Sequence, residues 1–333
     1  MLIHMSSRLR WGILSSSKFA RTKVIPALLR ARSLEVAAIA SRDLSVAKAH
    51  ADSFGIPLAY GSYEELLADP SIDIIYNPLP NHMHVEWSIR AAQAGKHVLC
   101  EKPLGLHTAE VDALIAARDA AKVVIGEAFM VATHPQWVWT KEAIAEGKIG
   151  QIRAIQGFFS YNNVDPKNIR NQAQAGGGAI MDIGCYTIFT PRFVLGRDPL
   201  RVCAQVEFDP AFQTDRLSSA MLDFGEVQCQ FICSTQANPY QRMHFHGTKG
   251  RIEVEIPFNA PPDKPALVFL DTGEGPKTNT FYLCDQYTIE GDAFTAAVRG
   301  ERPVPVSLES ARGNMRTIDA VFQSAREGRW VTL

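Results

Sequence analysis

From Leu9 to Glu127 the chain alternates between short, almost uninterrupted apolar runs and segments in which apolar residues recur every three to four positions. The short runs predict strands and the longer spacing predicts amphipathic helices. The predicted strands are Leu9–Leu14, Glu35–Ala40, Ile72–Tyr76, His97–Cys100 and Val123–Glu127. The predicted helices are Phe19–Leu29, Leu44–Phe54, Tyr63–Ala68, His82–Ala94 and Thr108–Ala120. Because apolar strands that alternate with helices form parallel sheets covered on both faces, we expect an α/β fold with a doubly wound Rossmann domain over residues 1–128.

The pattern changes after about residue 150, where strand-like runs are separated by turn residues and interrupted by one helix near 181–195. This texture predicts a large, mostly antiparallel open sheet in a second, α+β domain over residues 129–333. Its predicted strands are Gln151–Ser160, Arg201–Phe208, Leu217–Phe224, Val227–Thr235, His244–Gly247 and Arg251–Ile256. Two helices, Gln286–Arg299 and Leu308–Glu327, close the chain, and we expect them to pack back near the first domain.

Composition narrows the class of protein. A length of 333 residues favours two domains, and 46% hydrophobic with 21% charged residues is typical of globular proteins. The net charge of −1 gives no electrostatic case for binding nucleic acid or an anionic membrane. No apolar stretch approaches the roughly 18–20 residues that span a bilayer. The N-terminus lacks the apolar core of a signal peptide, and the six cysteines form no C-x-x-C pair, so we expect buried thiols and a cytoplasmic protein.

The first strand–helix turn departs from the G-x-G-x-x-G dinucleotide fingerprint. Positions 15 to 20 read Ser15, Ser16, Ser17, Lys18, Phe19 and Ala20. Serine is small, its hydroxyl suits a phosphate, and a helix N-terminus supplies backbone donors. We therefore take Ser15 to Phe19 as candidate cofactor contacts, with an ordinary serine N-cap as the alternative.

The second predicted strand ends at Ser41-Arg42, where an NAD-specific site usually carries an acidic residue. The planar guanidinium of Arg42 suits the 2′-phosphate of NADP, whereas Asp43 comes one residue late for the ribose. We expect NADP as the cofactor, with NAD still possible and a solvated surface arginine as the alternative reading.

After the next strand, Pro78, Leu79 and Asn81 form a rigid turn over the expected nicotinamide position, and we expect His84 to face the site. No metal is expected, because no carboxylate or cysteine is suitably spaced from the histidines.

Two segments carry the candidate chemistry. Glu101, Lys102 and Pro103 follow a short strand, at the edge where open α/β sheets bind ligands. The glycine run at 176–178 opens an apolar helix in which Asp182 and Tyr186 lie four apart, on one face. A lysine, a carboxylate and a phenol at a cofactor site could transfer protons. Taken singly, a surface lysine and a half-buried tyrosine are the simpler interpretations.

The whole chain resembles the glucose–fructose oxidoreductase, inositol dehydrogenase and rhizopine-catabolism (GFO/IDH/MocA) family. The segments that carry the resemblance are Trp11–Leu14, Pro78–His84, Ala94–Pro103, Glu127–Met130, His134–Gln136, Gly176–Tyr186, Gln286–Phe294 and Ser307–Met315. The resemblance implies NAD(P)-linked oxidation or reduction of sugars and polyols. It also implies a homodimer or homotetramer formed through the C-terminal sheet. Arg170 falls where relatives contact the cofactor, while Val131-Ala132 departs from their usual sequence.

Many members of the family have histidine where this chain has Tyr186. With tyrosine there, the chain resembles the branch of glucose–fructose oxidoreductase, NADP-dependent xylose dehydrogenase and dimeric dihydrodiol dehydrogenase. The hypothesis is that Tyr186 is the general acid/base, that Lys102 stabilises its phenolate and binds the reacting hydroxyl, and that Asp182 orients the substrate. Glu101 would pair with His84 or Lys102. The expected substrate is an aldose, anhydrosugar or related cyclic polyol. The alternatives are oxidation of trans-dihydrodiols and a non-catalytic dinucleotide-binding regulatory role.

Overall fold

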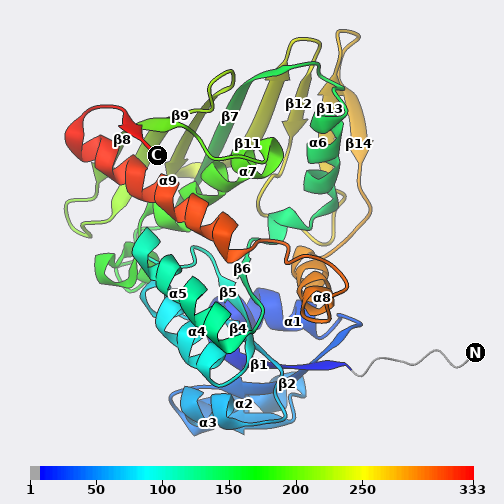
Figure 1. Cartoon of the computed structure of the whole chain (residues 1–333), viewed down its shortest axis with the longest axis vertical. Coiled ribbons are helices and arrows are strands. Elements are labelled where there is room, and N and C mark those ends of the chain that lie inside the picture. Colours follow the sequence, from blue (N-terminus) through cyan, green and yellow to red (C-terminus); the bar gives the residue numbers. More distant parts are fainter. Residues whose placement is uncertain (1–7) are drawn as a thin grey trace, which may run out of the picture.

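The computed structural model describes residues 8–333 and contains two sheets, one in each half of the chain (Figure 1). The first is a six-stranded parallel sheet in the order β3-β2-β1-β4-β5-β6, the strand order of a Rossmann domain. Its strands are β1 Leu9–Leu14, β2 Leu34–Ala40, β3 Leu58–Tyr60, β4 Ile74–Asn77, β5 His97–Glu101 and β6 Ile125–Ala128. The predicted parallel sheet is confirmed.

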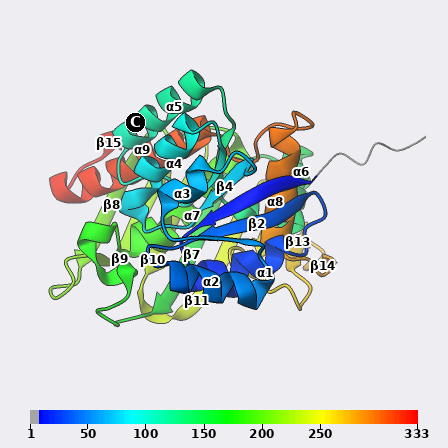
Figure 2. The ribbon, with the colours of Figure 1, turned by 90° about the horizontal axis from the view of Figure 1, so that it is seen from below.

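Helices cover both faces of this sheet. The first helix begins as a π-helical turn, Ala20–Val24, and continues as α1, Ile25–Leu28; α1 and α2 (Leu44–Phe54) lie on one side (Figure 2). The other side carries α3 Tyr63–Ala68, α4 His84–Gln93 and α5 Thr108–Ala121 (Figure 2). A 3₁₀ turn, Asn81–Met83, precedes α4. The segments after the carboxyl ends of β4 and β5 contact the second half of the molecule, since Asn81 bonds Gly176 and Lys102 bonds Asp182.

The second sheet has nine strands in the order β14-β13-β12-β11-β7-β10-β9-β8-β15. Strands β7 and β10 run parallel, and the other neighbouring pairs are antiparallel, which confirms the predicted mostly antiparallel sheet. Its strands are β7 Ile152–Asn162, β8 Arg201–Phe208, β9 Asp215–Asp223, β10 Gln228–Ser234, β11 Gln236–Gly247, β12 Arg251–Val254, β13 Leu267–Asp271, β14 Lys277–Thr280 and β15 Val331–Thr332.

One face of this sheet is covered by helices and the other is open. The helices are α6 Pro135–Ala145, α7 Cys185–Leu195 and α9 Leu308–Glu327, and α7 is preceded by a π-helical turn, Ile180–Gly184 (Figure 1). Along β10, Cys229, Phe231 and Cys233 are buried while the alternate residues are exposed. The expected burial of these two cysteines is therefore observed.

The last long connection returns to the first sheet. Helix α8, Gln286–Val298, packs its Phe294 ring edge-on against Trp11 of β1, with ring centroids 5.9 Å apart. Thr288 donates a hydrogen bond to the carbonyl of Ala27 over 2.8 Å. A Cβ at Gly291 would overlap Leu28, so α8 lies directly on α1. The domain boundary at residues 128 and 129 stays a prediction.

Several elements had no counterpart in the sequence reading: α6, β3, β13, β14 and β15. Helix α6 buries polar Gln136 and Thr140 beside Trp137 and exposes Val138, so its sequence lacks a clear division into an apolar and a polar face. Strand β14 reads Lys-Thr-Asn-Thr and lies at the sheet edge, without an apolar face. Within residues 8–333, no helix is both long and apolar enough to cross a membrane. The N-terminal segment used to argue against export lies almost wholly outside the described residues.

Candidate active site

The turn between β1 and the first helix has the geometry of a dinucleotide-binding turn although it lacks glycine. Ser15 has a φ of 85°, in the left-handed region that favours glycine, and its amide donates to Ala40 over 3.0 Å. Within residues 8–333 the amides of Ser16, Ser17 and Lys18 make no hydrogen bond. These donors at a helix start fit a pyrophosphate. Ser17 also caps the helix, since its Oγ accepts the Ala20 amide over 3.2 Å.

Ser41 and Arg42 lie at the end of β2, beside this turn. Ser41 is 9% exposed, and Arg42 is exposed to solvent. Burial raises the pKa of Tyr63, while the Arg42 charge and a hydrogen bond with Ser15 oppose that rise, so all three groups are close. Asp43 instead caps α2, accepting the amide of Ser45 over 2.8 Å. Among residues 8–333 no carboxylate forms an ion pair with Arg42, so its guanidinium fits a 2′-phosphate at this end of the turn.

His84 does not face the site, and that expectation is wrong. Its ring is 1% exposed, with Nδ1 2.8 Å from the Pro103 carbonyl and Nε2 2.7 Å from the Leu79 carbonyl. Burial lowers the pKa of His84 to about 4. The ring therefore joins the Pro78–Asn81 turn to the segment after Lys102. At the end of that turn, Asn81 donates to the carbonyl of Gly176 over 2.8 Å, linking the two halves of the chain.

Within residues 8–333, Glu101 forms no ion pair with the Lys102 ammonium and no hydrogen bond with His84, which corrects the predicted partner. Its Oε1 accepts the hydroxyl of Tyr76 over 2.6 Å. Burial raises the pKa of Glu101, although the Tyr76 hydrogen bond and the Lys102 charge oppose that effect. Glu101 thus connects the ends of β4 and β5 directly beneath Lys102.

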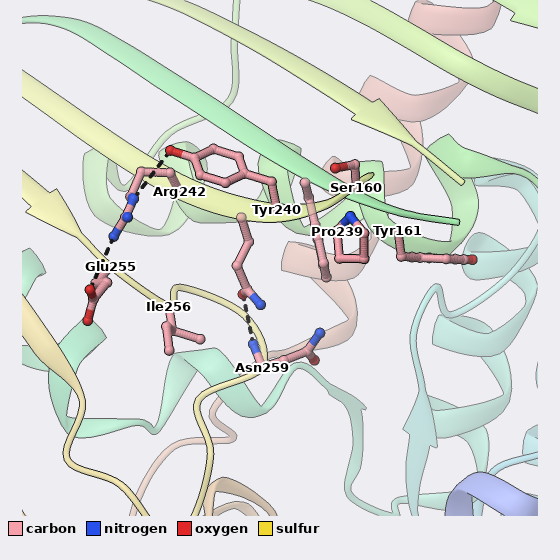
Figure 3. A pocket seen from close by; sticks show the side chains of 10 residues that line it. Ser160, Tyr161, Pro239, Tyr240, Arg242, Glu255, Ile256 and Asn259 are labelled. Carbon is pink, nitrogen blue, oxygen red and sulfur yellow. Dashed lines mark hydrogen bonds and ion pairs between the residues drawn. The ribbon is translucent and has the colours of Figure 1, made fainter. Parts of the chain in front are cut away.

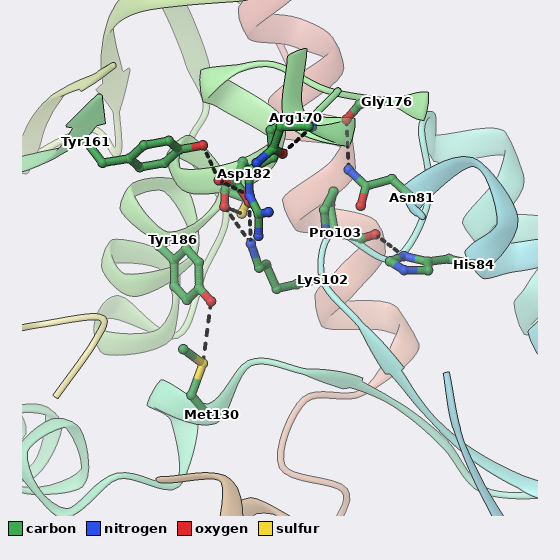
Figure 4. Close-up of polar contacts among 12 residues, drawn as sticks. Asn81, His84, Lys102, Pro103, Met130, Tyr161, Arg170, Gly176, Asp182 and Tyr186 are labelled. Carbon is green, nitrogen blue, oxygen red and sulfur yellow. Dashed lines mark hydrogen bonds and ion pairs between the residues drawn. The ribbon is translucent and has the colours of Figure 1, made fainter. Parts of the chain in front are cut away.

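Lys102 and Asp182 meet as predicted (Figure 4). The Lys102 Nζ donates to the Asp182 carbonyl over 2.6 Å and lies 3.3 Å from Oδ1 of the same residue. Both side chains are nearly buried, with 11% and 14% of their surfaces exposed. Burial opposes the charge on Lys102, but the Asp182 carboxylate outweighs it and raises the lysine pKa. Lys102 is therefore held as a cation.

The Asp182 carboxylate is the centre of this cluster (Figure 4). Its Oδ2 accepts the Tyr161 hydroxyl over 2.7 Å and pairs with Arg170 Nε at 2.8 Å. Burial opposes ionisation, yet Arg170 and Lys102 hold the pKa of Asp182 well below its usual range. Arg170, expected at the cofactor, here contacts the carboxylate. Tyr161 was not predicted, because only the register of β7 brings it to Asp182, 21 residues later in the chain.

Tyr186 lies beside the cluster but does not join it through its oxygen. The hydroxyl donates to Met130 Sδ at 3.5 Å, and Lys102 Nζ lies 4.8 Å from the centre of the ring (Figure 4). Burial raises the pKa of Tyr186 well above its usual range. The predicted contact between Lys102 and the phenol oxygen is thus absent from the described structure. Aromatic rings surround Tyr186, namely those of Phe129, Phe159 and Phe258.

A cavity of about 580 Å³ lies beside the cluster, between the end of β7, β11 and the 255–259 segment (Figure 3). Phe159 and Tyr161 line it and also contact Tyr186 and Asp182, respectively. Polar walls come from Ser160, Gln241, Arg242 and Asn259. No group of three or more histidine, cysteine or acidic residues within residues 8–333 could hold a metal ion.

Comparisons with known proteins agree with this arrangement. Residues 9–129 match the model of an oxidoreductase family with an NAD-binding Rossmann fold, and residues 137–253 match the GFO/IDH/MocA C-terminal domain. The chain is 46% identical over 330 residues to the uncharacterized oxidoreductase ORF334 of Rhizobium meliloti, covering 97% of this chain and 99% of the relative. It is 39% identical to D-xylose 1-dehydrogenase (NADP(+)) 2 of Haloferax volcanii, again covering 97% and 99%.

Among solved structures, a 3-ketoreductase from Actinomadura kijaniata in complex with NADP and TDP-benzene aligns with a TM-score of 0.89. Its sequence is 30% identical, and the alignment covers 96% of this chain and 98% of that chain. The predicted family is confirmed. The domain built around the first sheet is an NAD(P)-binding Rossmann domain.

Proposed function

The chain belongs to the GFO/IDH/MocA family of oxidoreductases, and from that premise we propose that it is an NADP-dependent dehydrogenase or reductase acting on CH–OH groups of sugars. The observation that carries the proposal is the buried pair of Lys102 and Asp182 beside the phenol of Tyr186. This cluster lies at the carboxyl end of β5, where a Rossmann domain places a nicotinamide.

The cofactor supplies hydride transfer, and the chain supplies binding and orientation. The free amides of Ser16, Ser17 and Lys18 would hold the pyrophosphate, and Arg42 would hold the 2′-phosphate. Phe19, Pro78, Leu79 and Asn81 would flank the dinucleotide along the same edge. His84 and Glu101 act from behind these segments, since each is bonded to neighbouring protein groups.

Each residue of the cluster would have a different role in proton transfer. Lys102, kept cationic by Asp182, would bind the reacting oxygen, and the Tyr186 hydroxyl would give or take its proton. Burial keeps the phenol neutral, so it is prepared to donate a proton when a carbonyl is reduced. In the oxidative direction a cation must stabilise the phenolate, and Lys102, whose Nζ lies 4.8 Å from the centre of the ring, would move toward the phenol oxygen to do so.

Sugars are the favoured substrates because Asp182, Arg170 and Tyr161 offer both donors and acceptors for hydroxyl groups beside the reacting position. The D-xylose dehydrogenase relative supports an aldose. A second candidate is oxidation of trans-dihydrodiols, which the aromatic wall of Phe129, Phe159 and Phe258 around Tyr186 favours. The intact cluster argues against a purely regulatory protein, which needs no proton-transfer groups.

The test is nicotinamide absorbance during incubation with NADP⁺ or NAD⁺ and a panel of aldoses and trans-dihydrodiols, followed by keto-sugars with NADPH. We expect turnover with an aldose and NADP⁺. Tyr186→Phe should lower kcat by about 10²–10⁴-fold, the usual contribution of a general acid or base. Phe193→Tyr, on the same helix but away from the cluster, is the matched control. If no substrate of the panel is turned over with either cofactor, or if Tyr186→Phe is fully active, the proposal is contradicted.

Two statements about the whole protein are part of this proposal. We place it in the cytoplasm, with reduced thiols. We also propose a homodimer or homotetramer formed through the open face of the second sheet, where apolar side chains are exposed. These include Leu217, Met221 and Ile232, which are 38–47% exposed.

A further inference from the structure

Asp215, at the start of β9, is a buried carboxylate that the proposed chemistry does not use. It is 1% exposed, and its Oδ2 accepts the amide of Ile180 over 2.7 Å and the hydroxyl of Ser218 over 3.1 Å. Ile180 begins the helical turn that carries Asp182 and leads to Tyr186. A side chain from the sheet therefore caps the helix of the candidate active site from 35 residues away in the chain.

The backbone before this helix is shaped around the same carboxylate. Gly178 has a φ of 118°, and a Cβ at this position would overlap Asp215 Oδ1. The Gly178 amide donates to the Arg170 carbonyl over 2.9 Å, and its carbonyl accepts the Asp182 amide over 3.0 Å. Gly178 thus links the backbones of Arg170 and Asp182, the two residues of the ion pair. The Asp215 carboxylate packs directly against Gly178.

We propose that Asp215 is a positioning residue that sets the place of Asp182 and Tyr186 relative to Lys102. The inference rests on the proposed function, because it assigns to those residues the proton chemistry. The helix start has four amides without helical partners, and a carboxylate satisfies them more strongly than a neutral acceptor does. Because the cap comes from the sheet, it ties the helix to the second domain while Lys102 belongs to the first.

The chain offers a matched control. Asp209 is also a buried aspartate, 7% exposed, and accepts two backbone amides, from Ala211 at 2.7 Å and from Phe212 at 3.0 Å. These amides belong to the turn between β8 and β9 rather than to the helix. Loss of either aspartate removes the same kind of bond, so a merely structural role would give the two variants similar effects.

The experiment compares Asp215→Ala, Asp215→Asn and Asp209→Ala in the full chain by steady-state kinetics, thermal melting and amide hydrogen exchange. We expect Asp215→Ala to lower kcat at least about tenfold, since small displacements of reacting groups cost about that much or more. The KM for NADP should stay within about twofold, because the nucleotide turn is remote. Exchange at Ile180 should accelerate. Asp215→Asn, which keeps an acceptor oxygen, should recover part of kcat.

Asp209→Ala should melt earlier with an unchanged kcat. The inference is overturned if Asp215→Ala retains its kcat while its melting temperature falls, or if Asp209→Ala loses as much kcat. If the unmodified protein turns over no substrate, the proposed function fails by itself. Amide exchange then decides the inference: acceleration over residues 180–186 in Asp215→Ala but not in Asp209→Ala supports it, and equal exchange refutes it.

Discussion

Lys102 combines burial with a full charge, and we propose that it therefore controls the chemistry of the candidate site. Its ammonium has the Asp182 carbonyl and carboxylate as partners and lies over the Tyr186 ring. Lys102→Met keeps the length of the side chain but leaves the Asp182 carboxylate with Arg170 as its remaining cation. We expect kcat/KM to fall by at least about 10²-fold, measured by nicotinamide absorbance. Lys264→Met, on an exposed loop, should be neutral; an active Lys102→Met would rule out its proposed role.

Glu127 shows how a buried carboxyl beside the site affects stability. It is 3% exposed; Oε1 accepts the Leu104 amide over 2.8 Å, and Oε2 has no partner within the described residues. Burial raises its pKa from 4.5 to about 8. Between these values the unfolded chain releases the proton and the folded protein keeps it. The folded state therefore binds more protons, and stability falls as pH rises from about 4.5 to 8.

Glu127→Gln should remove this dependence while keeping an acceptor for the Leu104 amide. Relative to the variant, the unmodified protein should lose up to about 1.4 kcal/mol of unfolding free energy per pH unit between pH 5 and 8. Urea unfolding of both proteins at pH 5, 6.5 and 8 measures the difference. Glu142→Gln, exposed on α6, should show no such trend. A constant difference between Glu127→Gln and the unmodified protein would show that Glu127 is ionised throughout.

At the scale of elements, we propose that the ends of β1 and β2 set the cofactor preference. Ser15 and Arg42 lie close together there, and Asp43 is occupied as the cap of α2. Arg42→Ala should raise the KM for NADP⁺ about tenfold or more while leaving the KM for NAD⁺ within about twofold, because a charge-assisted contact with phosphate is lost. Initial rates with both cofactors test this. Arg32→Ala, beyond α1, serves as the control, and equal changes for both cofactors would refute the assignment.

Elements with a distinct local pattern could be predicted from the sequence. Most strands of the first sheet have continuous apolar runs and were predicted for that reason. The predicted bounds of β8, α2, α3 and α9 are the same as the observed ones. Helix α6 and the edge strands could not be found, because tertiary contacts rather than periodicity define them. The same division holds in the site. Lys102, Asp182 and Tyr186 follow short local motifs, whereas Tyr161 and Asp215 reach Asp182 and Ile180 only through the register of the sheet.

His84 and Glu101 illustrate a different limit. Both lie in segments that were correctly placed relative to the strands of the first sheet, but sequence cannot tell whether a polar side chain turns toward a ligand or toward neighbouring protein groups. In the structure His84 bonds two carbonyls and Glu101 bonds Tyr76. Burying unpaired polar groups is costly, so each of these side chains turns to neighbouring protein groups, backbone carbonyls for His84 and a hydroxyl for Glu101.

At the scale of the whole molecule, the chain crosses between its two halves more than once. Arg30 pairs with Asp285 at 2.6 Å where α8 returns to the first sheet, and Asn81 bonds Gly176 shortly before the helix that carries Asp182 and Tyr186. Asp182 and Tyr186 belong to the second half and Lys102 to the first. The site therefore depends on how the two halves are held together, and contacts remote from Lys102 can change its chemistry.

The open face of the second sheet exposes several apolar side chains. Leu217, Met221 and Ile232 project from neighbouring strands β9 and β10 and are 42%, 47% and 38% exposed. Apolar side chains gathered on one sheet face are typical of protein interfaces. If this face joins copies of the chain, a charge at its centre must be buried without a partner, at a cost of several kcal/mol. We expect Met221→Asp to shift the protein from a dimer or tetramer to a monomer in light scattering.

Leu44→Asp is the matched control for this prediction, because Leu44 is 43% exposed on α2, far from the second sheet in the chain. It should leave the oligomer intact. A Met221→Asp protein of unchanged mass would exclude this face as the interface. The kcat of the monomer is also informative, because Met221 lies on the sheet face opposite α7. A monomer that keeps its kcat would show that each chain carries a complete site. The contacts of Asp182 with Lys102, Tyr161 and Arg170 all form within one chain.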